Sequence, residues 1–168
     1  MVASKPAKKA VKAVKSVGAA SKAAPRGLCL HPYLTFAGNC EAAFKAYQKI
    51  FGGEFCCLQR FKDKAAPGGK ADPKFRNQVA HMGLAAGSMV LMGADAGPEE
   101  LLTVGDNVSL SLKAPSAEEA KRIFEALSAK GKVHTPLAPT DWAELFGVAT
   151  DRFGICWSVC FMKEGCGK

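Results

Sequence analysis

Residues 32–54 read PYLTFAGNCEAAFKAYQKIFGGE, and this stretch decides the fold. The β-branched and aromatic run over 28–38 ends at the breaker Gly38–Asn39, which predicts a strand followed by a turn. The next segment predicts a helix over 40–53, with Asn39 as N-cap and Gly52–Gly53 as the C-terminal stop. The apolar residues with helical spacing are Ala43, Phe44, Tyr47, Ile50 and Phe51.

The same pattern occurs a second time further along the chain. Strands are predicted over 54–61 and twice within 77–95, where a hairpin turns near Ala86–Gly87. After a loop over 96–105, a strand is predicted over 107–114. A helix follows over 115–132, with Ser116 and Glu119 as a capping box, an apolar stripe along one face and Gly131 at its end. Three more strands are expected over 133–137, 143–151 and 154–161. The order strand, helix, three strands therefore occurs twice, which indicates an internal duplication and an α+β fold of two βαβββ modules with mixed sheets curled around a cleft.

The net charge of +8 is concentrated at one end of the chain. Residues 1–27 contain seven basic and no acidic side chains, so residues 28–168 carry 16 basic and 15 acidic ones. The globular part is therefore close to neutral, which argues against a basic nucleic-acid reader. The Ala/Lys-rich tail is predicted to be disordered or to be an organelle-targeting segment. A third alternative is an arm that binds an anionic surface.

The tail holds no apolar run long enough for a signal-peptide core or a membrane span, so a cytoplasmic protein is expected. The seven cysteines form an odd set without a C-x-x-C motif, and this favours reduced thiols over a disulfide framework.

Four segments together resemble a known family: PYLTFAGNCEAAFKAYQKIFGGE, SMVLMGAD, VSLSLKAPSAEEAKRIFEAL and FGVATDRFGICWSV. They look like the PhnB-like branch of the vicinal-oxygen-chelate superfamily, which also contains glyoxalase I, bleomycin-resistance proteins and extradiol dioxygenases. The resemblance implies one domain over 28–168, made of modules 28–95 and 106–162. It also implies a homodimer whose cleft binds a small molecule.

Metal-dependent members of that superfamily place His, Gln or Glu on the first and last strands of each module. Counting back from Gly38 and the helix, these positions fall here at Pro32, Leu91, Asn107 and Ser158. None of these is a good ligand for a divalent metal, so neither a metal nor another cofactor is expected.

The same register divides the strand residues between cleft and core. It turns Leu34 and Phe36 toward the cleft and Tyr33 and Thr35 toward the helix, although core packing would explain the same apolar residues. His81 is either a ligand contact or a histidine bonded within the sheet. The predicted ligand-binding residues are Leu34, Phe36, His81, Leu91, Asn107, Ser109, Cys156 and Ser158.

The cysteines of the strands are predicted to act singly. Cys156 and Cys160 share one face of the last strand, but their sulfurs would lie roughly 13 Å apart, too far for a disulfide. Cys56 and Cys57 are adjacent, so their side chains are expected on opposite faces.

Asp151–Arg152 precedes the last strand and allows two interpretations. Arg152 could reach an anionic ligand, or Asp151 could cap the turn while Arg152 stays solvated or paired.

These observations favour a small-molecule binding or sequestering protein with a metal-free cleft. Two alternatives stay open: a metal-dependent lyase or dioxygenase, and an interaction protein that acts through its basic tail. Methyl transfer is disfavoured because GLAAGSMVLMG lies on a hairpin, not on a glycine-rich loop between a strand and a helix.

Overall fold

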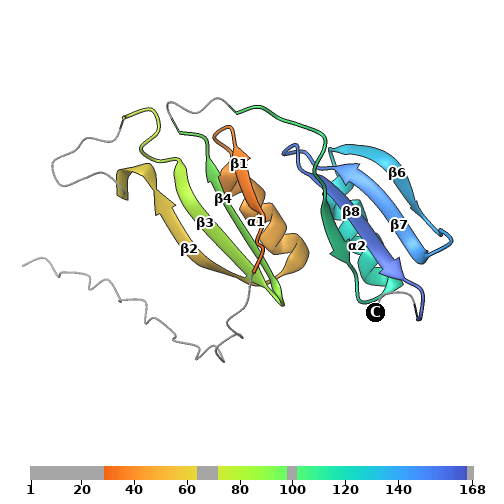
Figure 1. Cartoon of the computed structure of the whole chain (residues 1–168). Helices are drawn as coiled ribbons and strands as arrows, with labels where there is room; N and C mark the ends of the chain where they lie inside the picture. Colours follow the sequence, from red (N-terminus) through yellow and green to blue (C-terminus); the bar gives the residue numbers. More distant parts are fainter. Residues whose placement is uncertain (1–28, 64–71, 98–101, 166–168) are drawn as a thin grey trace, which may run out of the picture.

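The computed structural model describes residues 29–63, 72–97 and 102–165, so the predictions about residues 1–27 fall outside the described part. Two modules of the same order lie side by side (Figure 1). The first consists of β1 (Tyr33–Phe36), α1 (Cys40–Phe51), β2 (Glu54–Arg60), the 3-10 turn η1 (Phe61–Asp63), β3 (Val79–Ala86) and β4 (Met89–Asp95). The second consists of β5 (Leu110–Lys113), α2 (Ala117–Ser128), β6 (Lys132–Ala138), β7 (Ala143–Thr150) and β8 (Cys156–Met162).

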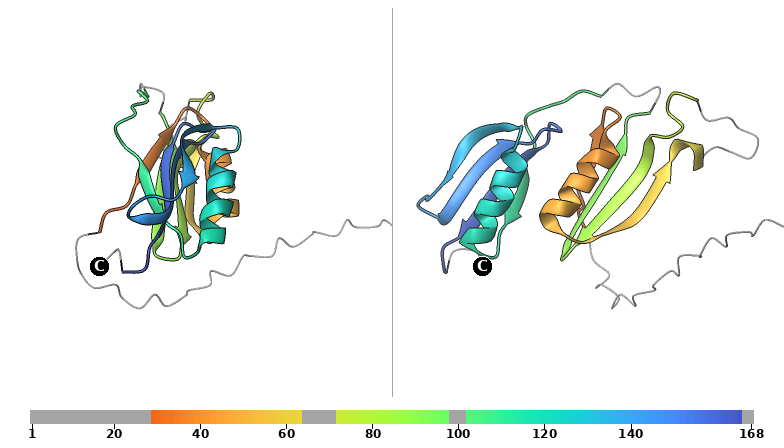
Figure 2. Two further views of the ribbon diagram at one scale, coloured as in Figure 1. Left: turned by 90° about the vertical axis from the view of Figure 1, so that its right-hand side faces the viewer. Right: turned by 180° about the vertical axis from the view of Figure 1, so that it is seen from behind.

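Each module forms one four-stranded mixed sheet with equivalent strand order, β1-β4-β3-β2 and β5-β8-β7-β6. The first strand of each module pairs parallel with the last, and the remaining pairs are antiparallel. Both helices lie on the same side of the two sheets (Figure 2). In the described part of the chain, each sheet therefore has a face covered by a helix, the helix face, and a face without one, which we call the open face. The α+β class and the duplicated βαβββ order are confirmed.

The helices bury the apolar stripes that the sequence predicts. Cys40, Ala43, Phe44 and Tyr47 are buried on α1, and Ala120, Ile123, Phe124 and Leu127 are buried on α2. Glycines in the strands allow each helix to pack closely on its sheet. A Cβ at Gly93 would lie 2.8 Å from the Phe44 ring of α1, and one at Gly147 would lie 2.7 Å from the Phe124 ring of α2. These glycines mark the helix face of β4 and β7.

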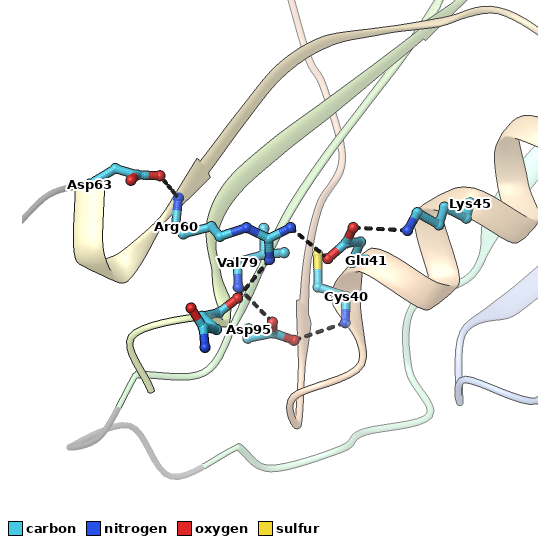
Figure 3. Close-up of polar contacts among 8 residues, drawn as sticks. Cys40, Glu41, Lys45, Arg60, Asp63, Val79 and Asp95 are labelled. Carbon is cyan, nitrogen blue, oxygen red and sulfur yellow. Dashed lines mark hydrogen bonds and ion pairs between the residues drawn. The ribbon is translucent and has the colours of Figure 1, made fainter. Parts of the chain in front are cut away.

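The start of α1 differs from the prediction. Asn39 occupies the N-cap position, but its side chain makes no capping hydrogen bond. Asp95, at the end of β4, accepts hydrogen bonds from the backbone N–H of Cys40 and of Val79, both at 2.8 Å (Figure 3). A carboxylate at a helix N-terminus also interacts favourably with the helix dipole. One buried side chain thus starts the helix and fixes it to the sheet.

The two ends of α2 differ in detail from the predicted capping box and glycine stop. The Ser116 hydroxyl accepts from the Glu119 N–H at 3.2 Å, as expected for a cap, while the Glu119 carboxylate binds Arg122. The residue with a left-handed backbone after the helix is Lys130, not Gly131. A side chain at Gly131 would collide with the Thr150 carbonyl of β7, so this glycine serves close approach to the strand.

The strands β2 and β6 pair irregularly with their neighbours. The pairing of β2 with β3 shifts between Phe55 and Cys57 and again between Gln59 and Arg60. The pairing of β6 with β7 shifts on either side of Thr135. Such bulges place two residues of one strand opposite one residue of its partner.

Candidate functional site

The helix face of the first sheet contains three of the predicted ligand-binding residues. Phe36 is 2% exposed and packs edge-to-face on Phe44 with ring centroids 6.3 Å apart. Leu34 pairs with Gly93, the residue that makes room for Phe44. Leu91 is 1% exposed in the same core. The predicted register was wrong by one residue, because α1 needs these larger apolar side chains beneath it.

The open face of the first sheet presents a pair of rings instead. The Tyr33 hydroxyl and His81 Nδ1 lie 3.2 Å apart, and the two rings stack with centroids 5.7 Å apart at 20°. Tyr33 is 50% exposed, so a molecule in solution can reach the pair. The structure places the predicted site residue His81 on this face, whereas Tyr33 was assigned to the helix side. The signal for Tyr33 was its alternation with Leu34 and Phe36.

The open face of the second sheet carries small polar side chains. Leu110 and Leu112 pack on the core, and Ser111 pairs with Ser158 on the other face. Cys156 and Ser158 are half-buried, and Asn107 and Ser109 are exposed just before β5. The structure therefore brings Cys156 and Ser158 together on one face, whereas Asn107 and Ser109 precede β5 and do not pair with β8.

Further groups lie around the second open face. His134 Nε2 lies 2.8 Å from the Thr150 hydroxyl, so this histidine bridges β6 and β7. Trp142 is 44% exposed and its ring centroid lies 4.9 Å from that of Phe146, the β7 residue that pairs with Cys160. Cys160 is 8% exposed, and its Sγ donates to the Leu112 carbonyl at 3.5 Å. Cys156 is thus the more accessible of the two thiols.

Asp151 caps the turn before the last strand, as the structural interpretation of Asp151–Arg152 predicted. It is 6% exposed and accepts from the backbone N–H groups of Phe153 at 2.8 Å and Ile155 at 3.1 Å. The Trp157 indole N–H donates to it at 2.9 Å. Arg152 is exposed and its guanidinium lies 4.7 Å from the centre of the Phe153 ring.

The connection between the modules is a feature that sequence reasoning missed. The Tyr47 hydroxyl of α1 donates to Asp151 at 2.7 Å, and the Tyr47 ring packs against Phe153 and Trp157. Burial, followed by the charge of Asp151, raises the pKa of Tyr47 above its ordinary value. The only signal was a tyrosine within an otherwise apolar helical stripe.

A cavity of about 220 Å³ lies between α1, α2 and the turn after β7. Its walls include Ala46, Tyr47, Ile50, Leu127 and Phe153, with Lys49, Lys130 and Arg152 also lining it. Asp151 also lines it, but its oxygens are already occupied by the turn and by Tyr47. The cavity is therefore a gap along the connection between the modules.

The cysteines of the first module differ in accessibility. Burial, then the charges of Asp95 and Glu41, raise the pKa of Cys40 to about 12, which makes this thiol unreactive at neutral pH. Hydrogen bonds from Lys45 and Arg60 hold the pKa of Glu41 below its usual range (Figure 3). Cys56 is exposed and Cys57 half-buried, and the bulge at this point turns both toward the open face, so the expectation of opposite faces was wrong.

Among residues 29–63, 72–97 and 102–165, no group of three or more His, Cys, Asp or Glu side chains is placed to hold a metal ion. In the same part of the chain no helix is long and apolar enough to cross a membrane.

A model of the family described as 3-demethylubiquinone-9 3-methyltransferase matches residues 29–160. The chain belongs to this family. This member of the 3-demethylubiquinone-9 3-methyltransferase family is 33% identical over 144 residues to Protein YjdN of Escherichia coli (strain K12), covering 80% of the chain and 96% of YjdN.

Several solved structures share the fold. Protein PA1353 from Pseudomonas aeruginosa is 37% identical with a TM-score of 0.74, covering 82% of this chain and 100% of PA1353. A putative 3-demethylubiquinone-9 3-methyltransferase, PhnB protein, from Bacillus cereus is 22% identical with a TM-score of 0.65, covering 79% and 98%. The fosfomycin resistance protein FosX from Listeria monocytogenes is 13% identical with a TM-score of 0.57, covering 83% and 94%. This 3-demethylubiquinone-9 3-methyltransferase family member therefore shares its fold with PA1353, the PhnB protein and FosX.

Proposed function

We propose that this chain binds a small molecule on the open faces of its sheets and holds no metal there. The observation that carries the proposal is the Tyr33–His81 pair, two stacked rings that present a phenol and an imidazole on an accessible surface. Aromatic rings with a few polar groups are typical of small-molecule sites. The ligand class that this chemistry favours is an aromatic or anionic metabolite.

Residues from both modules contribute to the proposed site. His81 comes from the first sheet, whereas Asn107, Ser109, Cys156 and Ser158 come from the second. Trp142 adds an exposed ring close to the second open face. Leu34, Phe36 and Leu91 are not part of the proposed site, because they are in the core.

A homodimer is part of this proposal. Within the described residues, the open faces carry no helix of their own chain, and a second copy would enclose them into the cleft that the family resemblance implies. Static light scattering at micromolar concentration should give twice the mass of one chain. A monomer under those conditions would contradict the dimer.

The donor groups of the described residues do not fit a superfamily-type metal site. The imidazoles of His81 and His134 lie on different sheets, and neither belongs to a group of three potential ligands. Elemental analysis of protein purified without chelators is expected to show no stoichiometric divalent metal. About one Zn, Ni, Mn or Fe per chain, lost on substitution of Asn107 and Ser158, would sink this part of the proposal.

The residues also do not fit an adenosylmethionine cofactor of the kind that the family description suggests. Adenosine cofactors are typically held by a glycine-rich turn between a strand and a helix N-terminus. Here Gly83, Gly87 and Gly93 lie on the β3–β4 hairpin, and no helix follows the turn. Titration calorimetry with S-adenosylmethionine should show no binding, and micromolar affinity would reopen methyl transfer.

The binding function is tested by a thermal-shift screen of aromatic and anionic metabolites. A true ligand should lose its stabilising effect in His81→Ala and Tyr33→Phe. Lys121→Ala, on the exposed surface of α2, is the matched control and should respond as the wild type does. A ligand that stabilises all four proteins equally would place binding elsewhere.

A further inference from the structure

Two adjacent thiols converge where β2 is irregular. Neighbouring residues of a regular strand point to opposite faces, so Cys56 and Cys57 would normally be separated by the sheet. Here Phe55 pairs with Leu84 and Cys57 pairs with Gly83, so Cys56 is the extra residue of a bulge. The bulge allows both side chains to reach the same face.

The residue opposite the bulge provides the space for both sulfurs. A Cβ at Gly83 would lie 2.5 Å from Cys56 Sγ and 3.0 Å from Cys57 Sγ. The two sulfurs are therefore no farther apart than the sum of those distances, on the side of the sheet to which His81 points. Any other residue at this position would push at least one sulfur aside.

The side chains around Cys56 and Cys57 limit the kinds of ligand that this pair can bind. No third His, Cys, Asp or Glu within the described part of the chain completes a metal site with this pair. A structural zinc ion needs four donors, so it does not fit. An atom that forms two bonds to the protein's sulfurs and already carries one substituent of its own does fit.

We propose that Cys56 and Cys57 form a vicinal dithiol site for one thiophilic centre of the class of monosubstituted trivalent arsenic compounds. Each thiol gives its proton to one hydroxyl of R–As(OH)₂, two As–S bonds replace two As–O bonds, and two water molecules leave. Nothing is oxidised or reduced, so no co-reactant is required. The proposal does not depend on the small-molecule function above.

The other described cysteines offer no comparable pair. Cys40 is buried, and Cys160 is 8% exposed and donates to a backbone carbonyl. Cys29 is exposed at the edge of the described residues, and Cys156 is four positions from Cys160 along β8. Burial and the neighbouring Cys56 thiol raise the pKa of Cys57, which favours its neutral thiol and does not oppose a condensation that uses neutral thiols.

The test uses the reduced full chain and phenylarsine oxide. Binding should saturate at one equivalent per chain and remove two thiols from reaction with a colorimetric thiol reagent. Mass spectrometry of proteolytic fragments should find the phenylarsenic adduct on the peptide that contains residues 54–60. Cys56→Ser and Cys57→Ser should each weaken binding by about 100-fold or more, because the second bond is intramolecular.

Two further variants make the test specific. Cys156→Ser leaves the pair intact and should bind as the wild type does. Gly83→Ala should weaken binding while thermal unfolding shows that the sheet still folds, because the added methyl group displaces the sulfurs. Wild-type affinity in either cysteine variant, or in folded Gly83→Ala, would overturn the proposal.

The outcome is independent of the small-molecule proposal. If phenylarsine oxide fails to bind while metabolite stabilisation still depends on His81, the dithiol site alone is refuted. If phenylarsine oxide binds as expected while metabolite stabilisation does not depend on His81, the small-molecule proposal alone is refuted.

Discussion

Asp151 serves two structural roles with one carboxylate. One oxygen accepts from the backbone of its own turn, and the other accepts from the Tyr47 hydroxyl and the Trp157 indole. A buried acceptor with four donors is costly to change, because each donor would lose its partner in a place that water does not reach.

Asp151→Asn should therefore destabilise the protein more than Tyr47→Phe. The amide keeps one acceptor oxygen but turns an NH₂ group toward donors, and we expect the free energy of unfolding to fall by about 3 kcal/mol. Tyr47→Phe removes one bond to a charged group and should cost about 1.5–3 kcal/mol. Urea unfolding measures both values, and a smaller loss for Asp151→Asn would contradict the assignment.

The stability at alkaline pH should report on Tyr47. An unfolded tyrosine ionises near pH 10, whereas burial and Asp151 raise the pKa of Tyr47 in the fold. The folded state then holds more protons than the unfolded state above about pH 10. The contribution of Tyr47 is fully present below that pH and is lost above it, by up to about 1.4 kcal/mol per pH unit.

Tyr47→Phe should lack this alkaline loss. The difference in unfolding free energy between wild type and variant is expected to be flat below pH 9 and to fall above pH 10. Tyr33→Phe, at the other tyrosine of the chain, is the control, because Tyr33 is half exposed. Parallel curves for wild type and Tyr47→Phe up to pH 11 would show that the burial of Tyr47 does not control this loss.

At the scale of elements, the two helices begin by different means. The α2 helix uses its local cap, Ser116, whereas α1 takes its acceptor from Asp95, 55 residues away from Cys40 in the sequence. Local capping can be recognised from a sequence pattern, but capping from another strand cannot.

Three substitutions should separate the two mechanisms. Ser116→Ala should cost about 1 kcal/mol, as loss of an N-cap usually does. Asn39→Ala should cost a few tenths of a kcal/mol, since its side chain caps nothing, and Asp95→Ala should cost at least about 2 kcal/mol because two backbone N–H groups lose their acceptor. Thermal unfolding ranks the three, and a larger loss for Asn39→Ala than for Asp95→Ala would be inconsistent with the structure.

Strand faces show where sequence reasoning succeeds and fails. In β5 the leucines alternate with serine, so the sequence leaves only one face that can meet α2, and Leu110 and Leu112 do pack on the core. In β1 both sets of alternating residues contain an aromatic ring, and counting from Gly38 gave the wrong set. At Cys56 nothing local announces a bulge; the reason for it lies across the sheet at Gly83.

At the scale of the whole molecule, the modules are joined by more than the chain between them. Tyr47 and Phe51 of α1 pack on Trp157, and the Arg122 side chain of α2 donates to the Ile50 carbonyl at 2.7 Å. The duplicated order could be predicted because each module repeats its own local pattern. The contacts between the modules could not, since they depend on how the two copies meet.

The modules should therefore unfold together. In Trp142→Phe, the single remaining tryptophan, Trp157, reports on the contact between the modules. Its fluorescence and the far-ultraviolet circular dichroism are expected to change over the same range of urea concentration. Two separate transitions would mean that the modules are stable independently.

The edge strands of both sheets are poor templates for pairing with a strand of another chain. In each sheet one edge strand has only four residues, β1 or β5, and the other is the bulged β2 or β6. The β6 edge also contains Pro136, which has no N–H to offer. Short, bulged or proline-containing edges resist the addition of a foreign strand and the aggregation that it starts. Strand addition at the sheet edges is therefore disfavoured, which leaves the sheet faces as the surfaces better suited to contact another chain.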